Sequence, residues 1–282
     1  MALLLIAEVS YEASAAIAVR LFPETGPLGM VAYRLVFAAV LLWAVARPRL
    51  RGVGRAGWAW ALAFGASLAV MNSLFYLALT RIGLGAAVTI ESIGPLVLSV
   101  VLSRRAAAWA WAGLGLVGVG LLGRGGFEHL DAGGVALALG AGTAWACYII
   151  CSRRVGQVFP GLQGLALAMA IGALGLAPLG VAVTGSVLLR PRLIALGLVV
   201  AVGSSALPYA LELIALRRLP AAVFSVMMTL APAVAALSGF LFLSQGLAWP
   251  QMAGMGAVIG ASIGAVVTTP APAEGSGSGA LG

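Results

Sequence analysis

The sequence predicts an all-α integral membrane protein with ten transmembrane helices, arranged as two inverted five-helix repeats. Three observations predict this fold. Of the 282 residues, 62% are apolar and only 9% are charged, a composition too apolar for an ordinary soluble protein. Apolar runs of about 20 residues, each long enough to cross a bilayer as a helix, recur from end to end. The chain also matches itself at a constant offset, which indicates a duplication.

The apolar runs define ten expected helices, separated by links of a few residues that leave no room for a soluble domain. The first segment has no basic start and is interpreted as a retained helix rather than a signal peptide. The last thirteen residues, PAPAEGSGSGALG at 270–282, predict a flexible tail outside the fold. The expected helices cover roughly residues 2–20, 27–46, 57–79, 83–102, 107–123, 132–151, 160–184, 191–216, 220–243 and 247–268.

The self-match keeps one register over most of the chain. Phe22-Pro23 falls on Phe159-Pro160, Arg81 on Arg218, and Pro95 on Pro232. A first repeat would then cover residues 1–130 and a second 131–269. Because each repeat holds an odd number of helices, the second enters the membrane in the opposite direction. Such an inverted repeat can be open to one side in one half and closed in the other, which provides alternating access.

The charge distribution predicts the orientation in the membrane. The net charge is +8, and all sixteen basic residues are arginines. An excess of positive charge marks cytoplasmic loops, so we expect both termini in the cytoplasm and a multi-pass protein of a bacterial-type inner membrane. Topology accounts for the charge, and we expect no nucleic-acid partner. With a cytoplasmic N-terminus, Arg47, Arg49, Arg51, Arg55, Arg104, Arg105, Arg153, Arg154, Arg217 and Arg218 face the cytoplasm, and Arg20, Arg81, Arg124, Arg190 and Arg192 face the other side.

Several ionisable and polar residues lie at membrane depth, where charge is costly and usually functional. Many share a helical face by their spacing of three or four residues, as Glu8, Tyr11 and Glu12 do. These stripes predict a central polar cavity, although hydrogen bonds between helices are an alternative explanation for any single residue. The predicted substrate-binding residues are Glu8, Tyr11, Glu12, Arg34, Asn72, Tyr76, Glu91, Trp145, Tyr148, Tyr209 and Met228, and Ser205 and Glu212 share the face of Tyr209.

Three prolines are predicted to break helices and act in gating: Pro95, Pro208 and Pro232. Proline lacks an N–H, so Pro95 leaves the carbonyl of Glu91 without its helical donor. Pro232 does the same for the carbonyl of Met228 at the matching position of the second repeat. Broken helices at equivalent positions of two repeats indicate a substrate site.

The expected site suits a zwitterion. A substrate ammonium would meet Glu91 or Glu8, and a carboxylate would meet Arg34, which forms bidentate pairs. Alternatively, Arg34 pairs with a glutamate only because an unpaired buried charge is costly. A third use of Glu91 is to exchange protons as the coupling ion.

Other features predict neither an enzyme nor a metal or cofactor site. Cys147 and Cys151 lie one helical turn apart with no further ligands nearby, and we interpret them as packing residues. The motif GLGLVGVG at 113–120 lies inside a membrane-spanning run, so it predicts close helix packing rather than dinucleotide binding. The glycines of 247–268 suggest that the last helices of the two halves pack together or form the face of a homodimer.

Several longer stretches resemble the EamA branch of the drug/metabolite transporter superfamily, and within it the threonine/homoserine and related amino-acid exporters. They are SLFYLALTRIGLGAAVTIESIGPLVLSV, LALGAGTAWACYI and ALPYALELIALRRLPAAVFSVMMTLAPAVAALSGFLFL. The resemblance implies ten helices in two inverted halves, cytoplasmic termini and export of small metabolites. It places Arg34, Glu91, Pro95, Pro208, Glu212 and Pro232 at recurring polar and helix-breaking positions.

The chain departs from the family pattern at two places. Ala231 stands where the family often has Glu, and Ser244-Gln245 where it often has Gly-Glu. The resemblance implies an exporter of amino acids or related small metabolites, including aromatic ones, that works by alternating access. A multidrug or cationic-compound exporter of the same superfamily is the alternative.

Overall fold

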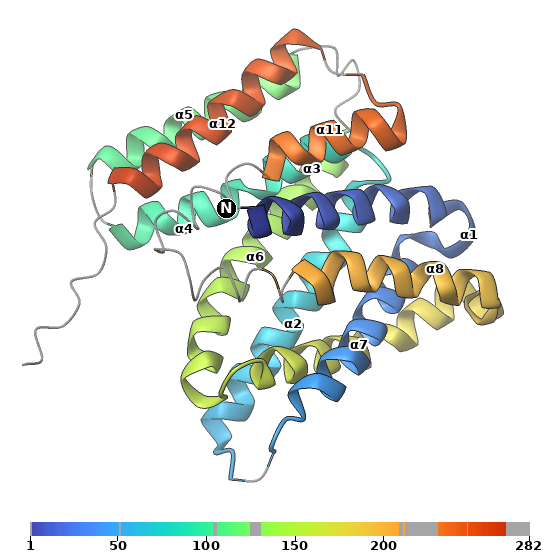
Figure 1. Ribbon diagram of the computed structural model, residues 1–282. Helices are drawn as coiled ribbons and strands as arrows, with labels where there is room; N and C mark the ends of the chain where they lie inside the picture. Colours follow the sequence, from blue (N-terminus) through green and yellow to red (C-terminus); the bar gives the residue numbers. More distant parts are fainter. Residues whose placement is uncertain are drawn as a thin grey trace, which may run out of the picture.

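The computed structural model describes residues 2–50, 52–103, 106–124, 131–208, 211, 231–246 and 248–268. All regular structure within these ranges is helical, and the all-α membrane fold is confirmed (Figure 1). The elements are α1 (Ala2–Ala46), α2 (Arg55–Ala78), α3 (Leu84–Glu91), α4 (Ile93–Ser103), α5 (Ala106–Arg124), α6 (Ala132–Val158), α7 (Gln163–Thr184), η1 (Gly185–Leu189), α8 (Pro191–Ala201), η2 (Val202–Ala206), α11 (Ala231–Leu243) and α12 (Trp249–Thr268).

Helix α1 consists of two helices that meet at Gly26. The φ and ψ angles of Gly26 are 64° and 164°, a conformation that side chains with a Cβ disfavour. Pro27 follows directly and opens the second helix, where its missing N–H costs nothing. The expected link at residues 21–26 is therefore wrong, because the first helix continues to Thr25 and turns sharply at one glycine (Figure 1).

Two other expected helices are interrupted. The helix expected at 83–102 divides at Ser92 into α3 and α4, one turn before Pro95. The helix expected at 191–216 changes at Val202 from an α-helix to the π-helical turn η2. Both interruptions lie beside the charged residues described below.

Four segments are long and apolar enough to cross a membrane by length and composition: Leu5–Ala46, Arg55–Ala78, Ala132–Val158 and Gln163–Leu189. The first of these contains the turn at Gly26. Further apolar helices of 10–17 residues include Pro191–Ala206 and Ala231–Leu243. Large apolar side chains such as Leu174 and Trp249 are exposed on the outside of the protein, where lipid would cover them.

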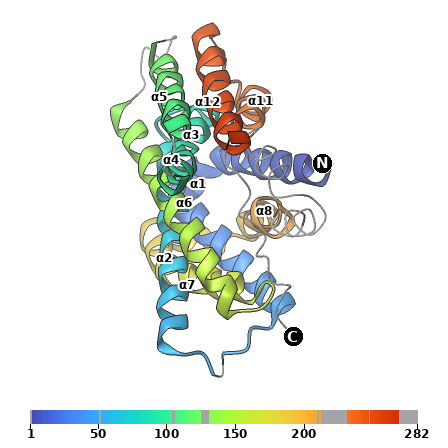
Figure 2. The same cartoon turned by 90° about the vertical axis from the view of Figure 1, so that its left-hand side faces the viewer.

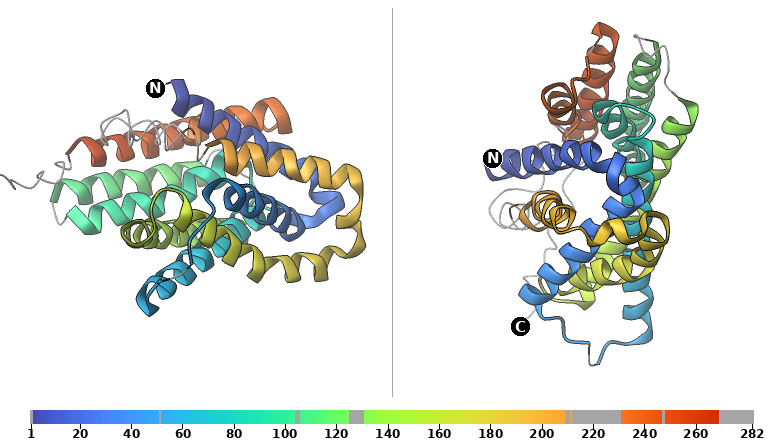
Figure 3. Two further views of the ribbon diagram at one scale, coloured as in Figure 1. Left: turned by 60° about the horizontal axis from the view of Figure 1, so that its bottom comes forward. Right: turned by 90° about the vertical axis from the view of Figure 1, so that its right-hand side faces the viewer.

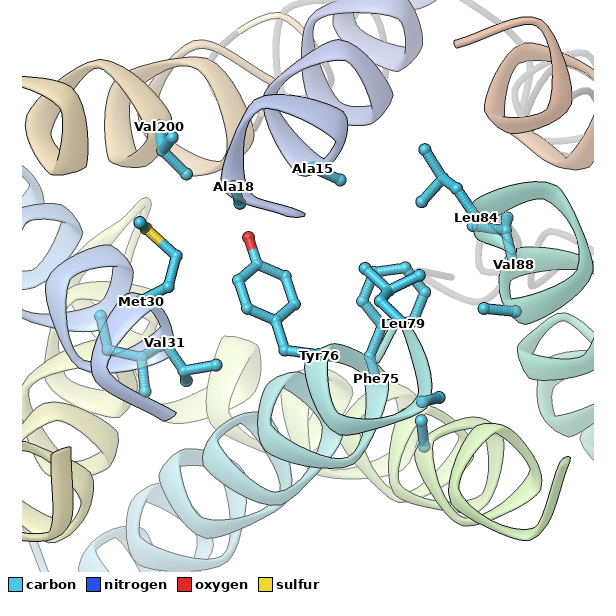
Figure 4. Packing of buried hydrophobic residues seen from close by; sticks show 14 of the residues in the cluster. Ala15, Ala18, Met30, Val31, Phe75, Tyr76, Leu79, Leu84, Val88 and Val200 are labelled. Carbon is cyan, nitrogen blue, oxygen red and sulfur yellow. The ribbon is translucent and has the colours of Figure 1, made fainter. Parts of the chain in front are cut away.

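The helices pack around one main apolar core. α1 packs against α7, α8 and α11, while α2 packs against α6 and α7 (Figures 2 and 3). Phe75 and Tyr76 of α2 project from this helix into the core, between Met30 of α1 and Leu84 of α3 (Figure 4). α5 and α12 lie side by side at one end of the molecule (Figure 1).

Glycines permit the closest helix crossings. A Cβ on Gly118 of α5 would lie 2.7 Å from the carbonyl oxygen of Gly254 of α12, so these backbones nearly touch. The expectation that these two glycine-rich helices pack together is confirmed. A Cβ on Gly94 would lie 1.9 Å from the carbonyl oxygen of Gly142 of α6, and a Cβ on Gly142 would lie 2.4 Å from that of Glu91. The break between α3 and α4 is thus pressed against α6.

We predict that Gly142→Ala destabilises the protein by about 1–3 kcal/mol or more, because backbone atoms on the opposing helix cannot move aside as a side chain can. Gly175→Ala, in α7 with nothing within 4 Å of its built Cβ, is the matched control and should keep the native melting temperature. Thermal unfolding in detergent measures both. Equal melting temperatures for the two variants would contradict the close crossing.

Outside the membrane-spanning segments, Asp131 caps α6 and ties it to the end of α2. Its carboxylate accepts hydrogen bonds from the N–H groups of Gly133 and Gly134 at 3.3 and 3.2 Å, and from the guanidinium of Arg81 at 2.7 Å. The hydrogen bond from Arg81 and the two backbone N–H groups hold the pKa of Asp131 below its usual value.

We predict that Asp131→Asn melts at a lower temperature than the native protein at neutral pH. A carboxyl whose pKa is lowered by folding stabilises the protein above its unfolded-state pKa, which is about 4, and this contribution is lost as the pH falls through the lower folded-state value. The gap between the two melting temperatures should therefore narrow below about pH 4. A gap independent of pH would show that the ionised carboxylate contributes nothing.

Candidate functional site

Six predicted site residues are buried in the middle of the molecule. They come from four segments, namely the two halves of α1, α2 and the end of α3. None of their side chains is more than 8% exposed. The residues are Glu8, Glu12, Arg34, Asn72, Tyr76 and Glu91, and we call them the polar cluster.

The charged members of the polar cluster interact with one another. Glu12 interacts electrostatically with Glu8, Glu91 and Arg34. Glu91 in turn interacts with Arg34. The fold therefore brings three carboxyl groups and one guanidinium into one region, although Glu8 and Glu91 lie far apart in the sequence.

Arg34 is held by the π-helical turn η2. Its Nε donates to the hydroxyl of Ser205 at 3.2 Å, and Nη2 donates to the carbonyl of Ser204 at 3.1 Å. Its guanidinium also lies over the ring of Tyr11, 4.8 Å from the centroid, and 5.8 Å from that of Tyr76. These contacts fix the cation between α1, α2 and α8.

The π-helical turn supplies the acceptors. A π-helical turn shifts the hydrogen-bond register of the helix and is frequent at functional sites. Besides Ser204, the turn offers the carbonyl of Gly203, which accepts from the hydroxyl of Ser10 at 2.7 Å. A Cβ on Gly203 would lie 2.1 Å from the hydroxyl oxygen of Ser14, so α1 approaches the turn at its glycine. Two hydrogen bonds to backbone carbonyls thus join α1 to η2.

Three buried polar atoms of the cluster have no hydrogen-bond partner among the residues that the structure describes. They are Oε2 of Glu12, Oδ1 of Asn72 and the hydroxyl of Tyr76. A buried polar atom without a partner costs about 1–3 kcal/mol, so such atoms call for an explanation. One explanation is a bound ligand that forms hydrogen bonds with these three atoms.

The backbone carbonyl of Glu91 packs against a neighbouring helix. Its oxygen lies against Gly142 of α6, in the close crossing described above. That Pro95 leaves this carbonyl without its helical donor and so makes it available to a substrate stays a prediction. The corresponding expectation for Met228, like that for Tyr209, falls outside the described residues.

The remaining predicted residues within the described ranges lie on α4, α6 and α11 and next to η2. Tyr148 of α6 packs its ring against Phe64 of α2, with ring centroids 5.0 Å apart, and Trp145 is partly buried on the same helix. Pro95 is partly buried in α4, whereas Pro208 and Pro232 are buried next to η2 and in α11. Whether these residues bind or gate a ligand stays a prediction.

Sequence reasoning missed two parts of the arrangement. Ser204, Gly203 and Ser10 form the contact between α1 and η2, but no sequence pattern announces a π-helical turn. Gln245, one of the departures from the family pattern, accepts a hydrogen bond from the N–H of Leu84 at 3.0 Å and so caps the start of α3. A neutral amide oxygen there satisfies a helix end rather than carrying charge.

An apolar groove of about 290 Å³ lies between α4 and α6, lined by residues such as Ile93, Val97 and Leu139. It includes no predicted site residue. Within the described ranges there is also no group of three His, Cys, Asp or Glu side chains placed to hold a metal ion. The polar cluster therefore remains the candidate site.

Comparison with known proteins gives a consistent result. The family model described as the EamA-like transporter family matches residues 132–267. The chain is 40% identical over 268 residues to the threonine/homoserine exporter RhtA of Escherichia coli K12, which covers 94% of this chain and 90% of that protein. It is 39% identical over 267 residues to RhtA of Salmonella typhimurium, with the same coverage.

A more distant relative and a solved structure extend this likeness. The chain is 30% identical over 264 residues to the uncharacterized transporter YwfM of Bacillus subtilis, covering 89% of this chain and 88% of that protein. A crystal structure with 18% sequence identity superposes with a TM-score of 0.63 over 93% of this chain and 96% of that chain. At this identity the structure supports the fold alone.

We predict that Ser205→Ala lowers the free energy of unfolding by about 1–3 kcal/mol, because it removes an acceptor from the buried guanidinium of Arg34. The matched control is Ser73→Ala, whose hydroxyl bonds only the carbonyl of Ala69 in its own helix, at 2.7 Å. Denaturant or thermal unfolding in detergent compares the two. Equal losses would show that the hydrogen bond to Arg34 contributes no more than one within a helix.

Proposed function

The chain belongs to the EamA-like transporter family, and we propose that it exports threonine, homoserine and amino acids of similar size from the cytoplasm across the inner membrane. The relatives that are about 40% identical over most of the chain are exporters of these two amino acids. A site for an amino acid has to bind an ammonium and a carboxylate at the same time. The polar cluster contains carboxyl groups for the first and a guanidinium for the second.

One observation carries this proposal, the buried carboxylate of Glu12. It is 1% exposed, and its Oε2 has no hydrogen-bond partner among the described residues. Glu8 and Glu91 add negative charge around it. The ammonium of an amino acid would supply both the missing donor and a compensating positive charge. The guanidinium of Arg34, beside Glu12 and Glu91, provides the positive side for the substrate carboxylate.

Alternating access would use two inverted repeats, covering 1–130 and 131–269. The packing of the helices supports this part of the proposal. If the two parts of α1, α2, α3–α4 and α5 correspond to α6, α7, α8, α11 and α12, then the contact of α2 with α6 has its counterpart in that of α8 with α1. Likewise the contact of α3 and α4 with α6 has its counterpart in that of α11 with α1.

Residues near the pseudo-symmetry axis add a local argument. Leu35 and Gly172 correspond under the offset that relates Phe22 to Phe159, and they lie against each other across α1 and α7. A residue that touches its own counterpart must lie close to the axis that relates the repeats. The contact supports a pseudo-two-fold relation between the halves.

We further propose that protons are the coupling ion, that both termini are cytoplasmic, and that Pro95, Pro208 and Pro232 serve the gating motion. Three carboxyl groups share the site with one guanidinium, which can balance only one of them, so protons can neutralise the others in an empty site. Arriving substrate ammonium would displace a proton. The arginine distribution supports the orientation. A homodimer stays a prediction.

The same excess of carboxyl groups over guanidinium favours a second candidate, the export of organic cations. An organic cation would satisfy Glu12 but leave the guanidinium of Arg34 without a substrate carboxylate. Amino acids and organic cations therefore make different demands on Arg34, and this difference separates the two functions.

We predict that the protein in proteoliposomes exchanges labelled threonine and homoserine, and that Glu12→Gln weakens this exchange about 10- to 100-fold. Removing the charge from a buried hydrogen-bonded pair costs roughly 1.5–3 kcal/mol of binding. An imposed pH gradient should drive net accumulation in the native protein. The measurement is radiolabel exchange at equal reconstituted protein, with and without the gradient.

Glu24→Gln is the matched control, because Glu24 lies at the protein surface, 3.1 Å from Arg192, and outside the cluster. Its exchange should equal that of the native protein. Native vesicles that exchange none of a full panel of amino acids would overturn the proposed function. Export of organic cations with unchanged activity in Arg34→Gln would establish the second candidate instead.

A further inference from the structure

Asn72 and Tyr76 form a pair on one face of α2. They are four residues apart, one helical turn, and their side chains are 2% and 0% exposed. Both carry a polar atom without a hydrogen-bond partner among the described residues, namely Oδ1 of Asn72 and the hydroxyl of Tyr76. Two such atoms on adjacent turns of one helix face indicate a shared role.

The chemistry of the pair is defined by what each group already does. The amide nitrogen of Asn72 donates to the carbonyl of Leu68 at 2.8 Å, which fixes the amide orientation and leaves Oδ1 as a pure acceptor. The hydroxyl of Tyr76 both donates and accepts. The pair thus offers one acceptor and one donor, the complement of an alcohol group.

Apolar side chains line one side of Tyr76. Its hydroxyl points away from α2 toward Ala18 of α1, with Met30 and Val200 nearby (Figure 4). On its other side the ring meets that of Phe22, with centroids 5.5 Å apart. These apolar side chains offer the hydroxyl no hydrogen-bond partner, and the guanidinium of Arg34, the charged group beside Tyr76, carries only donors. A bound molecule can therefore supply the acceptor for the proton of the hydroxyl.

The pair also lies beside the proposed ammonium site. Tyr76 interacts electrostatically with Glu12 and with Arg34. A substrate whose ammonium reaches Glu12 and whose carboxylate reaches Arg34 therefore brings its side chain toward α2. In threonine and homoserine this side chain carries a hydroxyl close to the ammonium.

We propose that Asn72 and Tyr76 are the specificity-determining residues for the side-chain hydroxyl of the substrate, an inference that rests on the proposed amino-acid export. The substrate hydroxyl donates to Oδ1 of Asn72 and accepts from the hydroxyl of Tyr76. An amino acid with a methyl group in that place leaves both buried atoms unpaired. Sites built to bond a hydroxyl reject the analogue without it far more strongly than apolar pockets reject one extra group.

Two isosteric pairs test this inference: threonine against valine, and homoserine against norvaline. Proteoliposomes loaded with labelled threonine are diluted into each unlabelled amino acid, and the initial exchange rates give kcat/KM. The native protein should prefer the hydroxylated member of each pair by roughly 5- to 100-fold. Tyr76→Phe and Asn72→Leu should each bring the ratio toward one, mainly by raising KM for the hydroxylated member.

Tyr33→Phe is the matched control, because the Tyr33 hydroxyl donates to the carbonyl of Leu188 away from the polar cluster. It should keep the native ratio. Gel filtration and thermal unfolding confirm that the variants fold, and each ratio is internal to one protein preparation, so differences in yield do not affect it.

A native ratio near one overturns the inference while leaving amino-acid export in place. So does a ratio that survives both variants, or a folded variant that loses threonine and valine exchange equally, which would make the pair structural. A native protein that exchanges none of the four amino acids overturns the proposed function, and the inference with it.

Discussion

A guanidinium buried among apolar helices must find its acceptors inside the protein, and helix α8 changes its geometry to supply them. In a regular α-helix each carbonyl already accepts one hydrogen bond from its own helix, and Pro208 removes that α-helical donor from the carbonyl of Ser204. The π-helical turn at Val202–Ala206 shifts this register and presents the carbonyl of Ser204 and the hydroxyl of Ser205 to Arg34. The ring of Tyr11 lies against the guanidinium held there, and Glu12 and Glu91 interact with it electrostatically. The site is therefore built around the partners of one cation.

Close backbone approach is the second requirement, and small residues meet it. Without a hydrophobic drive between helices in lipid, contact area and short backbone distances hold a bundle together. Gly94 and Gly142 let the break between α3 and α4 touch α6, so the carbonyl that Pro95 deprives of its helical donor packs against a neighbouring helix. The carboxylate of Glu91 at the end of α3 then remains the polar group that this segment contributes to the cluster. The break between α3 and α4 thus positions the side chain of Glu91.

The sequence was a reliable guide where the signal was long or costly. Apolar runs located the helices, and the rarity of charge at membrane depth singled out Glu8, Glu12, Arg34 and Glu91, all of which are buried. It was a poor guide where geometry depends on a few backbone angles. The turn at Gly26 replaces an expected loop, and the residues of Val202–Ala206, which include Gly203, Ser204 and Ser205, do not by themselves specify a π-helical turn. It also could not show that Gln245, a departure from the family pattern, would cap α3. Such contacts join residues far apart in the chain, and helical periodicity carries no information about them.

The repeats and the site obey different constraints. Helix contacts of the first half have counterparts in the second half, as the proposed alternation between two states of equal architecture would require. The buried charges within the described ranges, in contrast, all come from the first half. A substrate with an ammonium, a carboxylate and a hydroxyl has no two-fold symmetry, so a symmetric set of charges would leave some groups unpaired whenever it bound. The second half contributes backbone carbonyls and serines at η2 in place of charge. If both proposals hold, the two halves share the motion equally while the first half carries recognition. Substitutions that alter selectivity then need not alter the helices that move.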